Sequence, residues 1–257
     1  MPAPGNPLGK YIYCIVRSAE PRQFTNLGVG ERGDIVDTVH FENLAAVVSD
    51  SPIIEYASSR RNMMAHALVL EEVMKDLTIL PVRFSTVAPS GQAIEGQVLK
   101  RRFGELNGLM AEMEGRVEMG LKAFWYEGMI FEEILKEDPL IRRVRDKLVG
   151  RSTEETYYER IRLGEMVESA MWKKRDADAE KILDRLRPLA GKSRANKVIT
   201  DRMVLNAAFL IERKREPEFD EAVQKLDREM GSRMMFKYVG PVPPYNFVDI
   251  VVHWDEP

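Results

Sequence analysis

The stretch RVEMGLKAFWY, residues 116–126, divides the sequence into two parts with different patterning. Its main apolar residues fall on every second position, which is the period of a β-strand with one face directed at a core. These residues are Val117, Met119, Leu121, Ala123 and Trp125. Strand-like and helix-like segments alternate before this stretch, whereas residues 127–190 have helical character. We therefore predict an α+β protein with two domains, residues 1–114 and 115–257.

The first domain is predicted to be an α/β layer of short strands and two helices. Ser58-Ser59 opens the first helix, whose apolar residues repeat at intervals of three and four, and the second helix covers residues 94–113. Pro81 has no amide hydrogen, so its strand suits a sheet edge or a bulge. The strand-like segments are residues 10–17, 34–41, 44–50 and 78–84, with Glu42-Asn43 as a tight link.

The second domain is predicted to carry a helical insertion, about residues 127–190. Asp138-Pro139 marks a break, because proline suits the first turn of a new helix. Ser152 followed by Glu155 is a capping box, which predicts another helix start. The apolar stripe beyond it thins and then resumes, so either a protruding helix pair or one bent helix would fit.

Strands and a short helix complete the second domain. Residues 202–212 fit both a two-sided strand and a buried helix. A helix follows from Pro217, and two strands are predicted over residues 234–240 and 246–254, joined by a proline-rich corner.

That corner is GPVPPY, residues 240–245. Its adjacent prolines stiffen the connection and reduce the entropy of the unfolded chain. We expect the last strand, with Phe247 buried, to close the sheet of the second domain. Contacts with a partner are expected from Pro241, Pro243, Pro244 and Tyr245.

Composition limits the classes of function. The 38 Lys and Arg residues nearly balance 41 Asp and Glu residues, for a net charge of −3, which argues against a nucleic-acid-binding protein that works through a strongly positive field. The single cysteine, Cys14, allows no intramolecular disulfide and fits a reducing compartment. The sequence shows neither a signal peptide nor an apolar run of about 18 residues, so we expect a cytosolic protein without a membrane span.

Patterns typical of catalysis are weak. Residues 28–33, GVGERG, match the spacing G-x-G-x-x-G, but the segment that follows alternates as a strand, whereas the dinucleotide motif opens a helix. The histidines at 40, 66 and 253 are too dispersed for a zinc pattern. Cys14 lies among apolar residues, where a thiol is usually inert. We predict no enzyme, cofactor or metal site, and keep two alternatives: a small-molecule enzyme using Gly28–Gly33, and a helical scaffold module using residues 152–190.

Several segments together resemble the GvpL/GvpF family of gas vesicle proteins, in the order in which that family carries them. They are YIYCIV (11–16), LAAVVSD (44–50), LPVRFSTV (80–87), VEMGLKAFW (117–125) and GPVPPYNFV (240–248). The resemblance spans nearly the whole chain. The sequence departs from it at Val242, where the family often has Trp, and at Asn246, where it often has Ser.

This resemblance implies a fold and a role beyond what the residues alone indicate. It implies that the C-terminal domain is a modified ferredoxin-like domain with an added helical region. It also implies a minor structural or accessory protein in gas vesicle formation, associated with the hydrophobic major shell protein and other accessory proteins. The family brings no catalytic residues.

Overall fold

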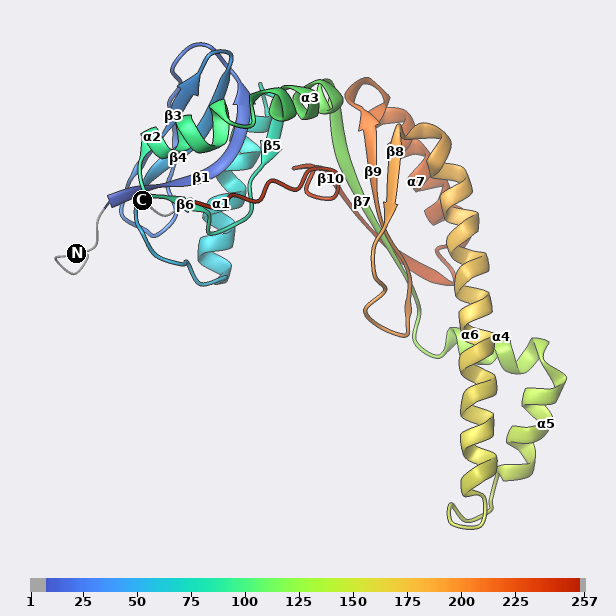
Figure 1. Ribbon diagram of the computed structural model, residues 1–257. Helices are drawn as coiled ribbons and strands as arrows, with labels where there is room; N and C mark the ends of the chain where they lie inside the picture. Colours follow the sequence, from blue (N-terminus) through green and yellow to red (C-terminus); the bar gives the residue numbers. More distant parts are fainter. Residues whose placement is uncertain (1–7, 255–257) are drawn as a thin grey trace. The chain divides into compact units, whose positions relative to one another are not determined.

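The protein, seen here as a computed structural model that describes residues 8–254, forms two compact units (Figure 1). Unit 1 extends to Glu118 and resumes at Pro241. Unit 2 is the intervening chain, Met119–Gly240. The first division lies close to the boundary expected at residue 114. The C-terminal segment, however, belongs to unit 1 and not to the second domain, where it was expected.

Unit 1 is built on an antiparallel sheet with the strand order β2-β3-β4-β1-β5, in which β6 also pairs with β1. Pro81 ends the edge strand β5, as its missing amide hydrogen predicts. Strand β2 was not expected, because its four residues are too few to show a periodic pattern. The strands are β1 (Leu8–Arg17), β2 (Phe24–Leu27), β3 (Ile35–Phe41), β4 (Leu44–Pro52), β5 (Ile79–Pro81) and β6 (Val87–Ala88).

The helices of unit 1 cover this sheet. The Ser59 hydroxyl caps the first of them by accepting a hydrogen bond from the Asn62 amide at 3.3 Å, which confirms the predicted helix start. This helix contacts β1, β2 and β5, while the π-helical segment η1 contacts β3 and β4. The helices are α1 (Arg60–Met74), α2 (Gly91–Ala93), η1 (Ile94–Lys100) and α3 (Phe103–Met113).

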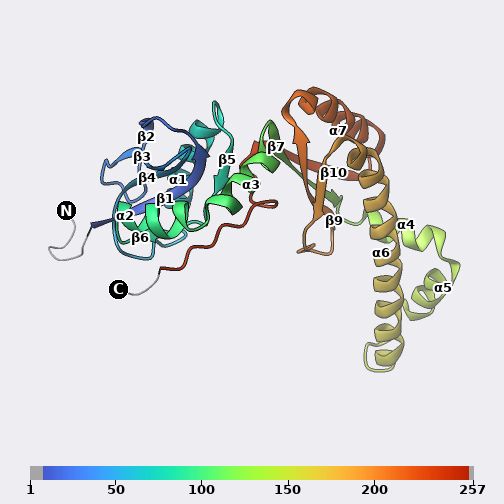
Figure 2. The same ribbon diagram turned by 45° about the horizontal axis from the view of Figure 1, so that its top comes forward.

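Unit 2 contains a four-stranded sheet with the order β10-β7-β9-β8, of which Figure 2 labels β7, β9 and β10. Strand β9 resolves the ambiguous stretch 202–212 in favour of a strand, and it is buried along nearly all its length. The apolar residues expected on one face of β7 are all buried. The strands are β7 (Arg116–Trp125), β8 (Lys192–Ala195), β9 (Met203–Glu212) and β10 (Met234–Val242).

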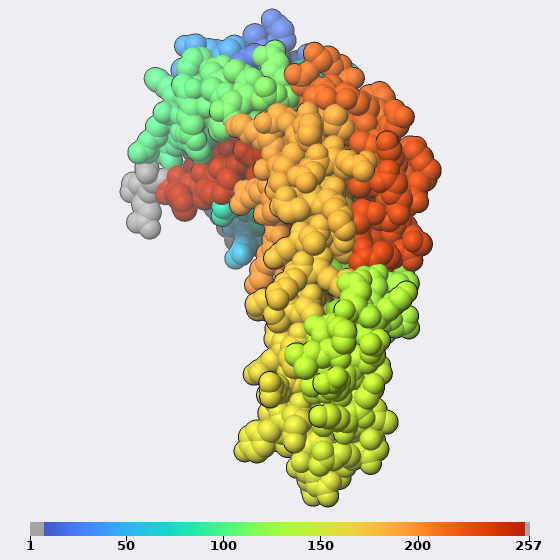
Figure 3. Space-filling model, turned by 90° about the vertical axis from the view of Figure 1, so that its right-hand side faces the viewer, coloured from blue at the N-terminus to red at the C-terminus, as the bar shows by residue number. Residues whose placement is uncertain are grey.

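The helical insertion of unit 2 is one long helix with two short helices beside it (Figure 3). Asp138 caps α5 ahead of Pro139, as predicted. Ser152 Oγ does accept the Glu155 amide at 3.3 Å, but the helix begins only at Tyr157. The helices are α4 (Met129–Glu137), α5 (Pro139–Leu148), α6 (Tyr157–Leu186), η2 (Arg187–Leu189), η3 (Arg213–Arg215) and α7 (Glu216–Met230).

The C-terminal segment differs most from the prediction. Residues 246–254 form no strand of the second sheet; Ile250 instead makes an isolated parallel bridge with Val82, beside strand β5 of unit 1. The amides of Phe247 and Val248 both donate to the Pro244 carbonyl, at 3.0 and 2.9 Å. In this turn the amides of Phe247 and Val248 are already hydrogen-bonded, so they are not available to pair with a neighbouring strand. Val248 and Ile250 are nevertheless buried, as a docked segment requires.

No helix within residues 8–254 combines the length and the apolar composition needed to cross a bilayer.

Candidate functional site

The proline corner divides into a buried and an exposed part. Pro244 is buried and Pro243 is half-buried, whereas Pro241 is exposed. Tyr245 keeps 42% of its surface exposed, although its hydroxyl reaches into the core of unit 1. Pro241 and Tyr245 are therefore the expected contact residues that remain most accessible.

A chain of hydrogen bonds leads from the corner into unit 1. Tyr245 Oη lies 2.7 Å from His66 Nε2, and His66 Nδ1 lies 2.9 Å from Tyr11 Oη. Tyr11 Oη also accepts the Ser85 amide at 3.0 Å. We assign the Tyr11 hydroxyl proton to His66 Nδ1 and the imidazole proton to Nε2, because this tautomer leaves each group with a donor and an acceptor. The Tyr245 hydroxyl then points to the Val82 carbonyl, 3.5 Å away.

Burial controls the protonation of this chain. It lowers the pKa of His66 to about 4, because the imidazolium would lose its hydration and no carboxylate is among the causes of the shift. Burial likewise raises the pKa values of Tyr11 and Tyr245. All three side chains are therefore neutral at neutral pH, so the chain acts as a structural connection in the folded protein.

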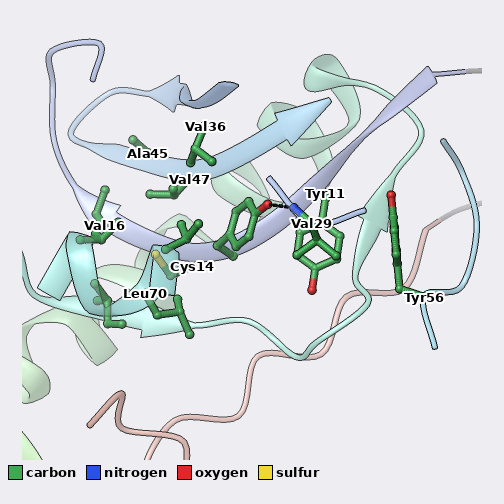
Figure 4. Packing of buried hydrophobic residues seen from close by; sticks show 13 residues of the cluster. Tyr11, Cys14, Val16, Val29, Val36, Ala45, Val47, Tyr56 and Leu70 are labelled. Atoms are coloured by element: carbon green, nitrogen blue, oxygen red, sulfur yellow. Dashed lines mark hydrogen bonds between the residues drawn. The ribbon is translucent and has the colours of Figure 1, made fainter. Parts of the chain in front are cut away.

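Tyr11 belongs to a tightly packed cluster on the face of the sheet that α1 covers (Figure 4). In a regular strand, Cys14 and Val16 would lie on the face opposite to Tyr11. A register shift near Tyr13 brings all three side chains into the same cluster. Tyr13 Oη accepts the Val29 amide and bonds to Ser49 Oγ, both at 2.9 Å. The hydroxyl groups of Tyr11 and Tyr13 therefore both have hydrogen-bond partners.

Three further contacts fix the C-terminal segment. Asn246 donates its amide to the buried Glu118 carboxylate at 2.9 Å. Arg83 forms a two-pronged ion pair with Asp249, at 2.9 and 2.8 Å. Arg102 donates to the Val251 carbonyl at 3.0 Å. The segment is held by polar contacts along its length, in addition to its buried apolar side chains.

The corner is visible in the sequence, whereas the residues that it contacts in the folded protein are not. The sequence assigned no structural role to His66, and the alternation of residues 116–126 does not predict that Glu118 is buried. His66 is a polar residue among the apolar positions of its helix, and this is the one signal that marks it in the sequence. The signal does not indicate that its partner is Tyr245, 179 residues away.

A groove with a volume of about 810 Å³ opens between β2, the following loop and α1. Exposed apolar side chains lie along it, among them Leu27, Met64 and Leu68. Glu72 ties the two walls together, because its carboxylate accepts the backbone amides of Thr25 and Asn26 at 2.7 and 2.9 Å. Arg61 and Glu31 pair at 2.8 Å and both contribute to the lining.

The glycines of Gly28–Gly33 are explained by packing. A Cβ atom at Gly28 would lie 2.5 Å from Ser49 Oγ. One at Gly30 would lie 3.0 Å from the Tyr56 ring, and the φ of Gly30 is +100°. Strand β3 follows this loop where a dinucleotide-binding loop would open a helix. The loop therefore lacks the helix N-terminus that receives a pyrophosphate.

The other reactive residues form no cluster. Cys14 is buried, and burial raises the pKa of its thiol, which disfavours the reactive thiolate. His40 is engaged by Thr38 Oγ1 at 2.6 Å, and His253 is exposed. Within residues 8–254 no group of three His, Cys, Asp or Glu side chains is arranged to hold a metal ion.

We predict that ATP, NAD and zinc leave the melting temperature of the protein unchanged. A ligand present at a hundred times its Kd would add about 2.7 kcal/mol to the stability. Thermal unfolding measured with and without each compound checks this expectation, and a reproducible increase of several degrees with any of them would contradict it.

Unit 2 contains a charged network that the sequence did not reveal. The Arg233 guanidinium binds Glu133 of α4 through two nitrogens and Asp178 of α6 at 3.0 Å. The indole of Trp125 donates to Asp178 at 3.0 Å. Lys174 adds a contact to Glu133 at 3.3 Å. The hydrogen bond from Arg233 is the main reason that the pKa of Glu133 lies below its usual value. This network joins α4 and α6 to the end of β7.

Comparison with known proteins gives one consistent result. Residues 9–249 match the family described as Gas vesicle synthesis protein GvpL/GvpF. The chain is 26% identical to gas vesicle protein F of Microcystis aeruginosa, over 95% of this chain and 99% of the relative. It is 30% identical to gas vesicle protein F of a Streptomyces species, over 94% and 100%.

Solved structures show the same likeness. The crystal structure of GvpF from an Anabaena species has a TM-score of 0.83 and 26% identity, covering 95% of this chain and 99% of that one. The crystal structure of GvpF from Microcystis aeruginosa has a TM-score of 0.76 and 27% identity, covering 93% and 98%. Fold and sequence therefore agree over nearly the full length of these proteins.

Proposed function

Because this chain belongs to the GvpL/GvpF family of gas vesicle synthesis proteins, we propose that it is a minor structural or accessory protein of gas vesicle assembly. It associates with the hydrophobic major shell protein and with other accessory proteins, and acts in the cytoplasm or on the vesicle. The family match over residues 9–249 carries this proposal. It works by binding, without catalysis or a cofactor.

Exposed apolar surface supports this role. A shell protein with a large apolar face aggregates before it polymerises unless a partner covers that face. The groove of unit 1 offers apolar side chains at Leu27, Met64 and Leu68 beside charged residues at its rim. Methionine suits such contacts because its thioether side chain adapts to irregular apolar surfaces.

The proline corner is the second proposed contact. Pro241 and Tyr245 present accessible surface next to the half-buried Pro243, and the buried Pro244 holds them in place. Because proline has little conformational freedom to lose, a partner can bind such a corner at a small entropic cost. The Tyr245 ring contributes both to the fold, through its hydroxyl, and to the proposed contact, through its exposed part.

Co-expression with the shell protein followed by a pull-down tests the proposal. We expect the Leu27→Glu, Leu68→Glu double variant to reduce recovery of the shell protein by about tenfold or more, because each new charge must be desolvated on binding. The matched control is Leu140→Glu, which places the same charge at an exposed leucine of unit 2. Pro241→Ser tests the corner in the same assay. Each variant must keep the wild-type melting temperature for its result to count.

The outcome in cells decides the role itself. Deleting the gene should reduce the number of vesicles or distort them, and the groove variant should reproduce part of that defect. Normal vesicles in normal number after deletion, together with no retained shell protein in the pull-down, would disprove the proposed function.

We also propose that unit 2 is a modified ferredoxin-like domain with an added helical region. Its element order is strand, helices, strand, strand, helix, strand, and its sheet order is fourth, first, third, second strand. The helices α4, α5 and the first half of α6 are then the added region.

A further inference from the structure

Strand β10 forms an open edge of the sheet of unit 2. Within residues 8–254 it pairs with β7 alone, so its other side has no neighbouring strand. Its nine residues make it longer than the outermost strands β2, β5 and β8, which have four, three and four residues. The outer side of an edge strand carries unpaired amide and carbonyl groups, to which a further strand can bind.

The pairing of β10 with β7 identifies the groups on this edge. The Tyr126 amide donates to the Arg233 carbonyl at 3.1 Å, and a Cβ atom at Gly120 would lie 3.0 Å from Val239 Cγ2. The two strands are therefore antiparallel, with Arg233 and Val239 among the residues whose backbone groups face β7. In such a pair every second residue faces outward, and no loop of residues 8–254 accepts a hydrogen bond from these outward amides. The outward-facing residues are Met234, Phe236 and Tyr238.

Two features that often protect a sheet edge do not close this one. Pro241 lies at a position that faces β7 by the same alternation, so its missing amide is not taken from the outer side. The Lys237 ammonium lies 5.4 Å from the centre of the Phe124 ring, so this side chain folds back over β7. The edge of β2, by contrast, is closed by Glu72, whose carboxylate accepts two of its amides.

The side chains beside this edge indicate which segment it would bind. In the register given above, Lys122 of β7 lies opposite Lys237 of β10, and both are exposed. Like charges in this position are unfavourable, and among residues 8–254 neither lysine forms an ion pair. Met235 and Val239, 39% and 58% exposed, flank Lys237 on the same face. A strand beside β10 would therefore gain from a central acidic side chain with apolar side chains two residues to either side.

We propose that the outer edge of β10 binds an extended segment of another protein, in which one acidic residue is flanked, two positions away on either side, by apolar residues. The segment extends the sheet of unit 2 by one strand. Its backbone bonds to Phe236 and Tyr238, and its acidic side chain lies beside Lys237 and Lys122. A second copy of β10 does not have this pattern, because the strand contains no acidic residue. This inference does not depend on the proposed function.

Amide hydrogen exchange, measured by nuclear magnetic resonance on the full chain, tests the proposal. The probe is a threonine-rich peptide with a central glutamate and a valine two residues to either side of it. At saturation we expect exchange of the Phe236 and Tyr238 amides to slow by about tenfold, because each gains a hydrogen bond. A peptide with lysine in place of the glutamate should bind about tenfold more weakly, because like charges then meet.

Two substitutions separate the backbone contribution from the charge. Phe236→Pro removes an outward amide, so it should bind the glutamate peptide about tenfold more weakly than Phe236→Ala, which loses the same ring and keeps the amide. Lys237→Glu should reverse the preference, so that the lysine peptide binds more tightly than the glutamate peptide. The matched control is Lys225→Glu, at an exposed lysine of α7, which should leave the preference unchanged.

Three results would overturn the proposal. The first is exchange of the Phe236 and Tyr238 amides that the glutamate peptide does not slow at its highest soluble concentration. The second is equal affinity of the wild-type chain for the glutamate and lysine peptides. The third is protection of the same amides without peptide as the chain is concentrated, with dimers in sedimentation equilibrium, which would assign the edge to a second copy.

Discussion

Replacing Arg233 with methionine should lower the free energy of unfolding of unit 2 by about 3 kcal/mol. The substitution keeps much of the side-chain length and removes the guanidinium that binds Glu133 and Asp178. Asp178 is 4% exposed, so its charge would remain buried, and among residues 8–254 its remaining partners would be Trp125 and the more distant Lys181. Removing one member of a buried ion pair costs about 3–5 kcal/mol, and we expect the lower end because Arg233 itself is 28% exposed.

Urea denaturation followed by tryptophan fluorescence measures this effect, since Trp125 lies within the network. The control is Arg187→Met, which removes another arginine of unit 2. Arg187 pairs with Glu180 at 2.8 Å on the surface, where an ion pair contributes less than about 1 kcal/mol to stability. Equal losses for the two variants would show that Arg233 has no special role.

Acidification from pH 6.5 to pH 4 should cost unit 1 about 3 kcal/mol through His66 alone. The folded-state pKa of His66 is lowered from 6.5 to about 4 by burial. The unfolded chain therefore binds a proton at His66 below pH 6.5 while the folded chain does not, so stability falls as pH falls through this window. Below about pH 4 both states are protonated, and the loss no longer grows.

A comparison of variants isolates this contribution from those of the carboxylates. His66→Gln should be less stable than the wild type at neutral pH, yet its stability should depend less on pH between 6.5 and 4. The exposed His253→Gln serves as the control and should keep the wild-type slope. If His66→Gln and the wild type lose stability in parallel on acidification, the assignment of His66 as the buried neutral group is wrong.

Local patterning predicted most elements but not their long-range partners. The alternation of β7, the cap at Ser59 and the break at Asp138-Pro139 depend on neighbours a few residues away, so they are visible in the sequence. Residues 202–212 stayed ambiguous because a strand covered on both faces has no polar side to reveal its period.

The sequence predicted the proline corner of the candidate site but not the residues of unit 1 that the corner contacts. The prolines of the corner stand out in the sequence. His66 and Glu118, which contact Tyr245 and Asn246 beside these prolines, do not stand out, because their partners lie far along the chain. The strand that was expected to close the sheet of the second domain does not form, and Phe247, expected to be buried, is half-buried, whereas Val248 and Ile250 are buried. Only the three-dimensional arrangement shows that the C-terminal segment docks on unit 1 beside Val82.

The discontinuous sequence of unit 1 has a consequence for the order in which the chain can mature. During translation the first 118 residues leave the ribosome long before residues 241–254, because all of unit 2 is synthesised between them. Until residues 245 and 246 have been synthesised, His66 and Glu118 do not make the contacts that Tyr245 and Asn246 supply. A prematurely terminated chain therefore keeps an unfinished first unit, however completely its second unit has folded. Completion of the core of unit 1 therefore requires that the chain has been synthesised past residue 250.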